Sequence, residues 1–357
     1  MSKDNHVNIP VFIPHLGCPN MCVFCNQRLI SGVEQFKEEN AREEIEKVLF
    51  TVRGAEKTAE IAFFGGSFTG IDRTLMISLL DLAEEYVRRG EVSGIRMSTR
   101  PDYINEEIVE ILKKYTVSAV ELGIQSFDDN VLMKSKRGHT ADDSRKAMNM
   151  LRDNGFTTVG QMMIGLPGAD GESEKECARE IVSLGASAAR IYPTVVFRGT
   201  ELASSFDKGE YKPLTVEEAV QRSADVLEIF VENGVDVLRI GLCESENLHS
   251  DSSYYAGPNH PSLGELVYSE LYRRRIFDAL DNADVQERNV TVFVPTGAIS
   301  KAVGQGKRNI NLIIEKYGVK SVSVREECTL KEYNIRIKTE EIRKLNHKEK
   351  KIVLKIT

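Results

Sequence analysis

The chain has 357 residues, of which 41% are hydrophobic and 28% charged, and its net charge is −7. This balance is typical of a globular protein with one large domain and a smaller one. No apolar run reaches the roughly 18 residues of a membrane span. The start, MSKDNHVNIP, lacks the apolar core of a secretory signal. We therefore expect a cytoplasmic protein with no membrane partner.

From residue 9 onward, short apolar runs of strand length alternate with amphipathic runs of helix length. The predicted strands are 9–13, 60–65, 94–99, 119–124, 157–165, 188–196 and 235–242. The predicted helices are 39–53, 73–89, 105–115, 140–154, 172–184 and 215–233, several of them preceded by capping residues at Asp72, Asn105, Thr140 and Thr215. This alternation predicts an α/β fold, with parallel strands in a partial or full (β/α) barrel. The active site of such a fold lies at the C-terminal ends of the strands.

The alternation stops near residue 243. We predict a core over 1–243, a substrate-covering loop and helical connection over 244–290, and a small α+β domain over 291–357. Residues 291–357 hold 15 Lys and Arg against 7 Asp and Glu, whereas the preceding 290 residues hold 32 against 47. A basic segment on an acidic body indicates either a polyanion-binding appendage or a solvated surface.

Three of the six cysteines form the sequence Cys18-Pro-Asn-Met-Cys22-Val-Phe-Cys25, directly after the first predicted strand. The others, Cys177, Cys243 and Cys328, are scattered, which does not suit a disulfide framework. Three thiolates at this spacing suit three irons of a cubane cluster and leave the fourth iron open to a small molecule. A structural zinc site needs a fourth ligand, and the spacing of nearby His15 is not a usual zinc arrangement.

The CxxxCxxC motif, with Phe24 before its last cysteine, resembles the cluster motif of the radical S-adenosylmethionine (SAM) superfamily. The resemblance implies a 4Fe–4S cluster on Cys18, Cys22 and Cys25. It also implies reductive cleavage of SAM to a 5′-deoxyadenosyl radical, which abstracts hydrogen from a substrate. A reducing partner such as flavodoxin or ferredoxin would supply the electron. The predicted SAM contacts lie mainly at the ends of successive strands: Gly65, Gly66, Ser98, Arg100, Glu121, Gln125, Arg137 and Gly165.

Longer runs, GIQSFDDNVLMKSKRGHT, IGLPG and RIYPTVVFRGTELASSFDKGEYKPLT, resemble the radical SAM domain of the Elongator catalytic subunit, a tRNA-modifying enzyme, over roughly residues 9–245. The resemblance implies a tRNA base as substrate, with Tyr192 and Arg198 as substrate or SAM contacts. Cys243 is the thiol predicted beside the barrel mouth and a candidate hydrogen-atom donor. That subunit also has an acetyltransferase domain, but GQGKRN at 304–309 is not the pyrophosphate loop of acetyltransferases.

Residues 298–310 resemble the helix–loop–helix of a KH domain, with Lys307 in place of the second glycine of its GxxG loop. Lys301, Lys307 and Arg308 are therefore candidate contacts to RNA phosphates. Several loop residues could cover the barrel mouth. The Arg273–Arg275 run could be either an RNA contact or a solvated helix face. The loop candidates are Glu244, His249, Tyr254, Tyr255 and His260.

Two alternatives to an RNA-modifying enzyme stay open. The first is a radical SAM enzyme that acts on a small molecule, as the coproporphyrinogen-dehydrogenase-like enzymes do. The second is a non-catalytic iron–sulfur protein that binds RNA and senses redox state.

Overall fold

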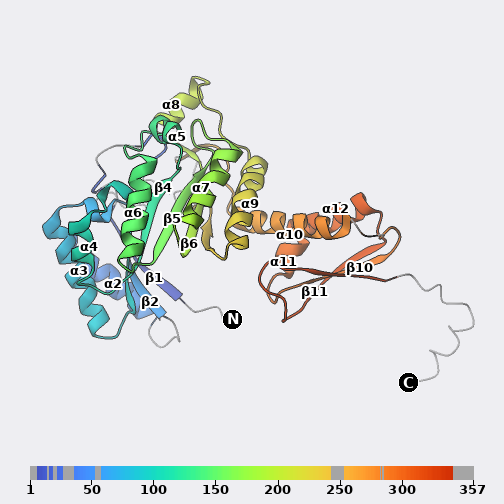
Figure 1. Cartoon of the computed structure of the whole chain (residues 1–357), viewed down its shortest axis with the longest axis horizontal. Helices are drawn as coiled ribbons and strands as arrows, with labels where there is room; N and C mark the ends of the chain where they lie inside the picture. Colours follow the sequence, from blue (N-terminus) through green and yellow to red (C-terminus); the bar gives the residue numbers. More distant parts are fainter. Residues whose placement is uncertain are drawn as a thin grey trace, which may run out of the picture. The chain divides into compact units, whose positions relative to one another are not determined.

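A computed structural model describes residues 6–13, 16–18, 22–26, 36–52, 58–242, 253–281, 283 and 285–340. The chain divides into two compact units, Met1–Leu263 and Gly264–Thr357 (Figure 1). Helix α10 (Leu263–Asp281), which the sequence analysis placed in a connecting segment, belongs almost entirely to the second unit. Among the described helices, none is both long enough and apolar enough to cross a bilayer.

The first unit is built on a seven-stranded sheet in the order β1-β2-β3-β4-β5-β6-β8, in which all neighbouring strands are parallel. The strands are β1 (His6–Phe12), β2 (Thr58–Phe64), β3 (Gly94–Thr99), β4 (Val117–Gln125), β5 (Thr158–Ile164), β6 (Ala188–Pro193) and β8 (Asp236–Ile240). The sheet does not close, because β1 and β8 are its two edges. The predicted parallel α/β fold is confirmed in its partial-barrel form.

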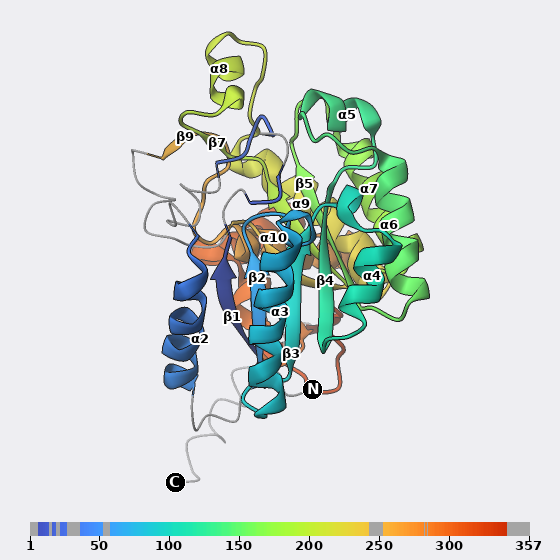
Figure 2. The same ribbon diagram turned by 90° about the vertical axis from the view of Figure 1, so that its left-hand side faces the viewer.

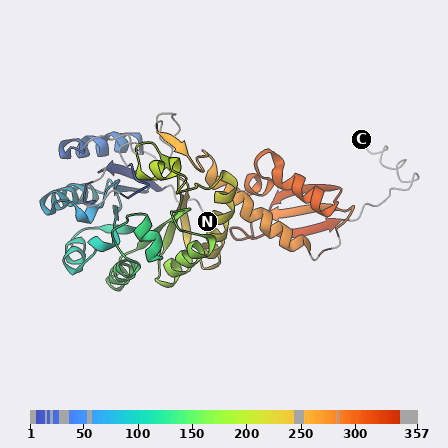
Figure 3. The same cartoon turned by 90° about the horizontal axis from the view of Figure 1, so that it is seen from above.

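Helices connect the successive strands and cover the outer face of the curved sheet (Figures 2 and 3). They are α2 (Glu38–Val52), α3 (Arg73–Arg88), α4 (Glu106–Leu112), α6 (Ala141–Asp153), α7 (Gly171–Ser183) and α9 (Val216–Glu232). The side chains of all four predicted capping residues accept hydrogen bonds from the first turns of their helices. These crossovers bring all the C-terminal strand ends to one edge of the sheet.

The structure differs from the prediction around residues 188–208. The predicted strand 188–196 ends as β6 at Pro193, and the chain continues into β7 (Val196–Phe197). Strand β7 pairs antiparallel with β9 (Tyr254–Ala256), far along the chain. Helices α5 (Asp129–Lys134) and α8 (Glu201–Asp207) were not predicted, because six or seven residues are too few to show a helical period. Both lie beyond the C-terminal ends of the strands (Figure 2).

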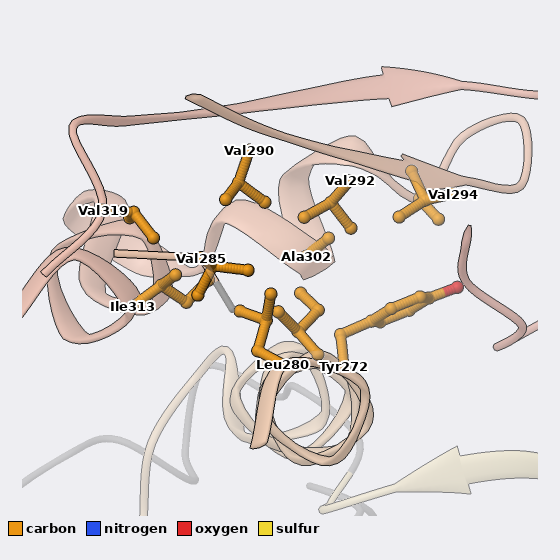
Figure 4. Close-up of a cluster of buried hydrophobic side chains, with 11 residues drawn as sticks. Tyr272, Leu280, Val285, Val290, Val292, Val294, Ala302, Ile313 and Val319 are labelled. Atoms are coloured by element: carbon orange, nitrogen blue, oxygen red, sulfur yellow. The ribbon is translucent and has the colours of Figure 1, made fainter. Parts of the chain in front are cut away.

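In the part of the second unit that the structure describes, three helices pack on a three-stranded sheet. Strand β10 (Asn289–Val294) lies between the parallel β11 (Ser321–Glu326) and the antiparallel β12 (Arg336–Glu340). Helices α11 (Ile299–Val303) and α12 (Arg308–Tyr317) form the predicted helix–loop–helix between β10 and β11. Every second residue of β10 points into a core shared with α10 (Figure 4). The assignment of this unit to the KH class stays a prediction.

Candidate active site

The C-terminal ends of β1 to β6 and the cysteine segment enclose a cavity of about 900 Å³, including space open to solvent. Most of the side chains predicted from the sequence to hold the cluster and SAM line this one cavity. Its lining consists of Phe12, Cys18, Phe24, Cys25, Phe64, Gly65, Gly66, Ser98, Thr99, Arg100, Glu121, Gly123, Gln125, Arg137, Gln161, Arg190 and Tyr192. Parallel strands explain this convergence, since residues far apart in the sequence end at the same edge.

Cys22 is buried beside this cavity, and the segment around it is anchored on two sides. The Nη1 atom of Arg137 donates to the Cys22 Sγ atom at 3.4 Å. The next residue, Val23, donates its N–H to the Ser135 carbonyl at 3.2 Å and accepts from the Leu202 N–H at 2.8 Å. Val23 also packs against Leu202 in a small apolar cluster. The unpredicted helices α5 and α8 therefore fix the position of the cysteine segment.

Gly66 allows the chain after β1 to pass close to the chain after β2. A Cβ atom at Gly66 would lie 2.3 Å from the Leu16 carbonyl oxygen and 2.5 Å from that of Ile13. The Ser67 N–H donates to the Leu16 carbonyl at 2.9 Å. The two glycines are predicted from the sequence to contact a ligand. Both do line the cavity, but the closest approach at Gly66 is to the backbone that leads into the cysteine segment.

The chemistry of the three cysteines suits a cubane cluster. Among the described residues, no group of three or more His, Cys, Asp or Glu side chains is placed to hold one metal ion. A cubane cluster takes each thiolate on a different iron, so its ligands need not meet at one point. Burial raises the pKa of the Cys18 thiol, whereas the positive charges of Arg137 and Arg100 oppose this rise. Both guanidinium groups therefore favour thiolate ligands.

Three buried polar atoms of the cavity lining have no hydrogen-bond partner among the described residues: Arg100 Nη1, Arg137 Nε and Gln125 Oε1. The other side of the Arg100 guanidinium is fixed by Asp102, at 2.9 and 2.8 Å. Gln125 has a φ of 70°, a strained conformation for a residue other than glycine. Buried polar groups in native proteins are normally satisfied. Two donors and one acceptor without partners fit a ligand such as SAM, which carries a carboxylate together with amino and hydroxyl groups.

A network of charged side chains from neighbouring strands surrounds the fully buried Glu121. Its carboxylate accepts from Arg190 at 2.8 and 3.0 Å, from Arg96 at 3.1 Å and from Gln161 at 3.0 Å. Arg96 also bonds Glu60 at 3.0 Å. Glu121 lines the cavity as predicted, but protein groups occupy its oxygens. Its partners were missed by the sequence analysis. Polar residues inside otherwise apolar strands are the sequence feature that could have identified these partners.

Of the remaining predicted contacts, Gly165 and Arg198 lie outside the cavity lining and Tyr192 belongs to it. Gly165 is not part of the cavity lining, since its N–H donates to Glu174 at 2.6 Å and its carbonyl accepts from Tyr211 at 2.7 Å. Tyr192 does line the cavity. Arg198 lies over the Tyr255 ring, 4.7 Å from its centre, in a neighbouring depression beside α8. The roles assigned to these residues stay predictions.

The candidate hydrogen-atom donor Cys243 and the loop candidates Glu244 and His249 fall outside the described residues. Of the others, Tyr254 and Tyr255 lie in β9. His260 lines a separate small pocket, where its Nδ1 accepts from the Ser262 N–H at 3.1 Å.

In the second unit, Lys307 and Arg308 are exposed at the turn between α11 and α12. The side chain of Lys301 lies over the Tyr268 ring, 4.3 Å from its centre. The Arg273–Arg275 run is held inside the unit: two of its arginines bond Glu270, and the third donates to the Tyr333 carbonyl at 2.8 Å. These contacts favour a structural role for the run.

Comparison with known proteins agrees with this arrangement. The family model of the radical SAM superfamily matches residues 12–181, and the radical SAM C-terminal domain matches residues 186–273. A tRNA uridine(34) acetyltransferase of Methanocaldococcus jannaschii is 38% identical over 183 residues, 50% of this chain and 33% of that protein. An uncharacterised protein of the same organism is 31% identical over 237 residues, 63% of this chain and 72% of that protein.

The fold is also that of a solved relative. The structure of Methanocaldococcus infernus Elp3 with an N-terminal deletion superposes with a TM-score of 0.60 and 25% identity, covering 76% of this chain and 63% of that one. The chain spans only about a third of the length of the curated acetyltransferase it matches. The chain therefore belongs to the radical SAM superfamily, whose members use a 4Fe–4S cluster and SAM, and it is homologous to Elongator complex protein 3 and the archaeal tRNA uridine(34) acetyltransferases.

Proposed function

We propose that this chain cleaves SAM reductively in the cavity at the strand ends and uses the resulting radical to modify RNA, with a tRNA base as the substrate. The observation that carries the proposal is the cavity itself. It joins the cysteine segment to two arginines and a glutamine whose buried polar atoms lack partners among the described residues. The choice of tRNA rests on the homologous tRNA uridine(34) acetyltransferase.

In this proposal Cys18, Cys22 and Cys25 hold the cluster. When bound, the cluster and SAM supply a 5′-deoxyadenosyl radical that abstracts a hydrogen atom. A small reducing protein such as flavodoxin or ferredoxin provides the electron.

Arg100 is the residue best placed to bind the SAM carboxylate, because Asp102 orients its guanidinium and leaves the Nη1 atom available. Gln125 Oε1 accepts from a hydroxyl or amino group of SAM. The rings of Phe12, Phe24 and Phe64 line the same cavity and limit the access of water to the reacting centre.

The basic second unit presents the RNA. Lys307 and Arg308 are exposed at a turn of the helix–loop–helix, where they can contact phosphates. Tyr192 lines the cavity and is the candidate contact to the reacting base.

The test is anaerobic reconstitution of the wild-type chain and of Cys22→Ala, followed by reduction with dithionite in the presence of SAM. Iron, sulfide and 5′-deoxyadenosine are measured with and without bulk tRNA. We expect about four irons per wild-type chain, 5′-deoxyadenosine from the wild type alone, and more of it with tRNA.

The other outcomes separate the alternatives. If tRNA changes neither the rate nor the products of SAM cleavage, a small-molecule substrate is favoured. A wild-type cluster that never cleaves SAM overturns the enzymatic proposal and favours a redox-sensing protein.

A further inference from the structure

We propose that Arg137 sets the reduction potential of the cluster through its hydrogen bond to Cys22. This inference rests on the cluster assignment made in the proposed function. It gives Arg137 a positioning and tuning role in place of the SAM contact expected from the sequence.

The contact itself is specific. Arg137 Nη1 donates to Cys22 Sγ at 3.4 Å, while Nη2 donates to the Gly123 carbonyl at 2.5 Å. The second bond fixes the plane of the guanidinium and thereby aims Nη1 at the sulfur. Both residues of the sulfur contact are buried, with exposed fractions of 8% for Arg137 and 7% for Cys22. Electrostatic interactions in such an environment are much stronger than at the surface.

The surrounding chain is built to accommodate this arginine. A Cβ atom at position 123 would lie 2.5 Å from Arg137 Nη2, so only glycine leaves room for the side chain. The Ser135 carbonyl, two residues before Arg137, accepts from the Val23 N–H, one residue after Cys22. The segment that carries the arginine is therefore tied directly to the segment that carries the thiol.

The charge of Arg137 is also uncompensated. Among the described residues it has no carboxylate partner, whereas the nearby Arg100 forms a two-point ion pair with Asp102. Reduction of the cluster adds one electron and breaks no bond, so the reduced form carries one more negative charge. A buried cation that donates to a ligand sulfur stabilises that form more than the oxidised one. Hydrogen bonds to the sulfurs are a recognised determinant of cluster potential, and Arg137 therefore raises it.

The test is a redox titration of the reconstituted full-length chain without SAM, followed by electron paramagnetic resonance. Three variants are compared with wild type. Arg137→Gln removes the charge, Gly123→Ala displaces the side chain but keeps the charge, and Lys136→Gln is the control. Lys136 neighbours Arg137 in sequence but pairs with exposed Glu201. Its loss removes the same charge without touching the sulfur contact.

We expect Arg137→Gln to make reduction at least tenfold less favourable, a fall of about 59 mV for one electron. Gly123→Ala should lower the potential by less, and Lys136→Gln should leave it unchanged. Iron and sulfide content must match wild type in each sample.

Potentials of Arg137→Gln and Gly123→Ala equal to wild type overturn this inference alone and leave the proposed function standing. Loss of the cluster in both variants also overturns it, since Arg137 would then be needed for assembly. A wild-type chain that assembles no cluster overturns both proposals.

Discussion

The arginines on the two sides of the cavity differ in how their charges are compensated. On the side of Glu121, Arg96 and Arg190 are neutralised by carboxylates within hydrogen-bond distance. On the side of the cysteines, Arg137 has no carboxylate partner among the described residues, and Arg100 keeps one buried nitrogen unpaired. Since burial of an uncompensated charge is costly, the fold retains it only where a ligand supplies the balance. The paired arginines therefore belong to the scaffold of the cavity, whereas the arginines beside the cysteines belong to its binding surface.

The largest loss of stability should follow from removing the carboxylate that balances the arginines on the Glu121 side. Replacing Glu121 with leucine leaves the buried Arg190 and the half-buried Arg96 near each other without their shared carboxylate. Removal of one partner from a buried ion network typically costs about 3–5 kcal/mol. We expect the free energy of unfolding of the cluster-free chain to fall by this amount, as measured by urea denaturation. The matched control is Glu172→Leu, which breaks an exposed pair with Arg179 and should cost less than about 1 kcal/mol. Equal losses in the two variants would show that the Glu121 network contributes no more to stability than an exposed ion pair.

The pH dependence of stability tests the charge environment on the cysteine side of the cavity. Burial, followed by the charges of Arg137 and Arg100, lowers the pKa of His139 to about 3. The folded chain therefore holds this imidazole neutral, whereas the unfolded chain protonates it near pH 6.5. Its contribution to stability is complete above pH 6.5 and is lost progressively as the pH falls toward 3.

We expect His139→Gln to flatten the pH dependence of the free energy of unfolding in this window by a few kcal/mol, on the order of 1.4 per pKa unit. The measurement is urea denaturation of the cluster-free chain at several pH values. His260→Gln is the control, because the half-buried His260 ring accepts a hydrogen bond from the Ser262 N–H in a separate pocket. The same slope in wild type and His139→Gln would show that the imidazole is not held neutral.

Loss of one unpaired donor should weaken ligand binding on the cysteine side. A charge-assisted hydrogen bond contributes about 1.5–3 kcal/mol, so Arg100→Met should weaken SAM binding by about ten- to a hundredfold. Calorimetric titration of the reconstituted, oxidised protein with SAM measures this change. Arg145→Met is the control, because Arg145 pairs with Glu180 away from the cavity. An unaltered SAM affinity in Arg100→Met would remove Arg100 from the binding site.

The sequence predicted the parallel strands and most of the cavity lining, but not how the charges of that lining are compensated. The motif at Cys18–Cys25 and the polar residues at strand ends are local features, and parallel topology brings them together. Three contacts join residues that are far apart in the sequence. Arg190 pairs with Glu121, Arg137 donates to Cys22, and Gly66 packs against the Leu16 backbone. No periodicity encodes such contacts. The β7–β9 pairing was missed for the same reason, since it joins residues nearly 60 positions apart.

The smallest effect concerns the exposed cations of the second unit, which differ from the buried arginines in being open to solvent. Lys307 lies in the left-handed region, with a φ of 63°, at the turn before α12. Each exposed cation that contacts a phosphate should change the slope of log affinity against log salt by about 1. We expect the pair Lys307→Gln and Arg308→Gln to reduce this slope by about 2 and to weaken tRNA binding at low salt, as measured by filter binding. Lys320→Gln with Lys331→Gln removes the same charge from other parts of the unit and serves as the control. An equal loss in both pairs would mean that tRNA responds only to net charge, whereas a loss confined to Lys307 and Arg308 would locate the contact at the helix–loop–helix.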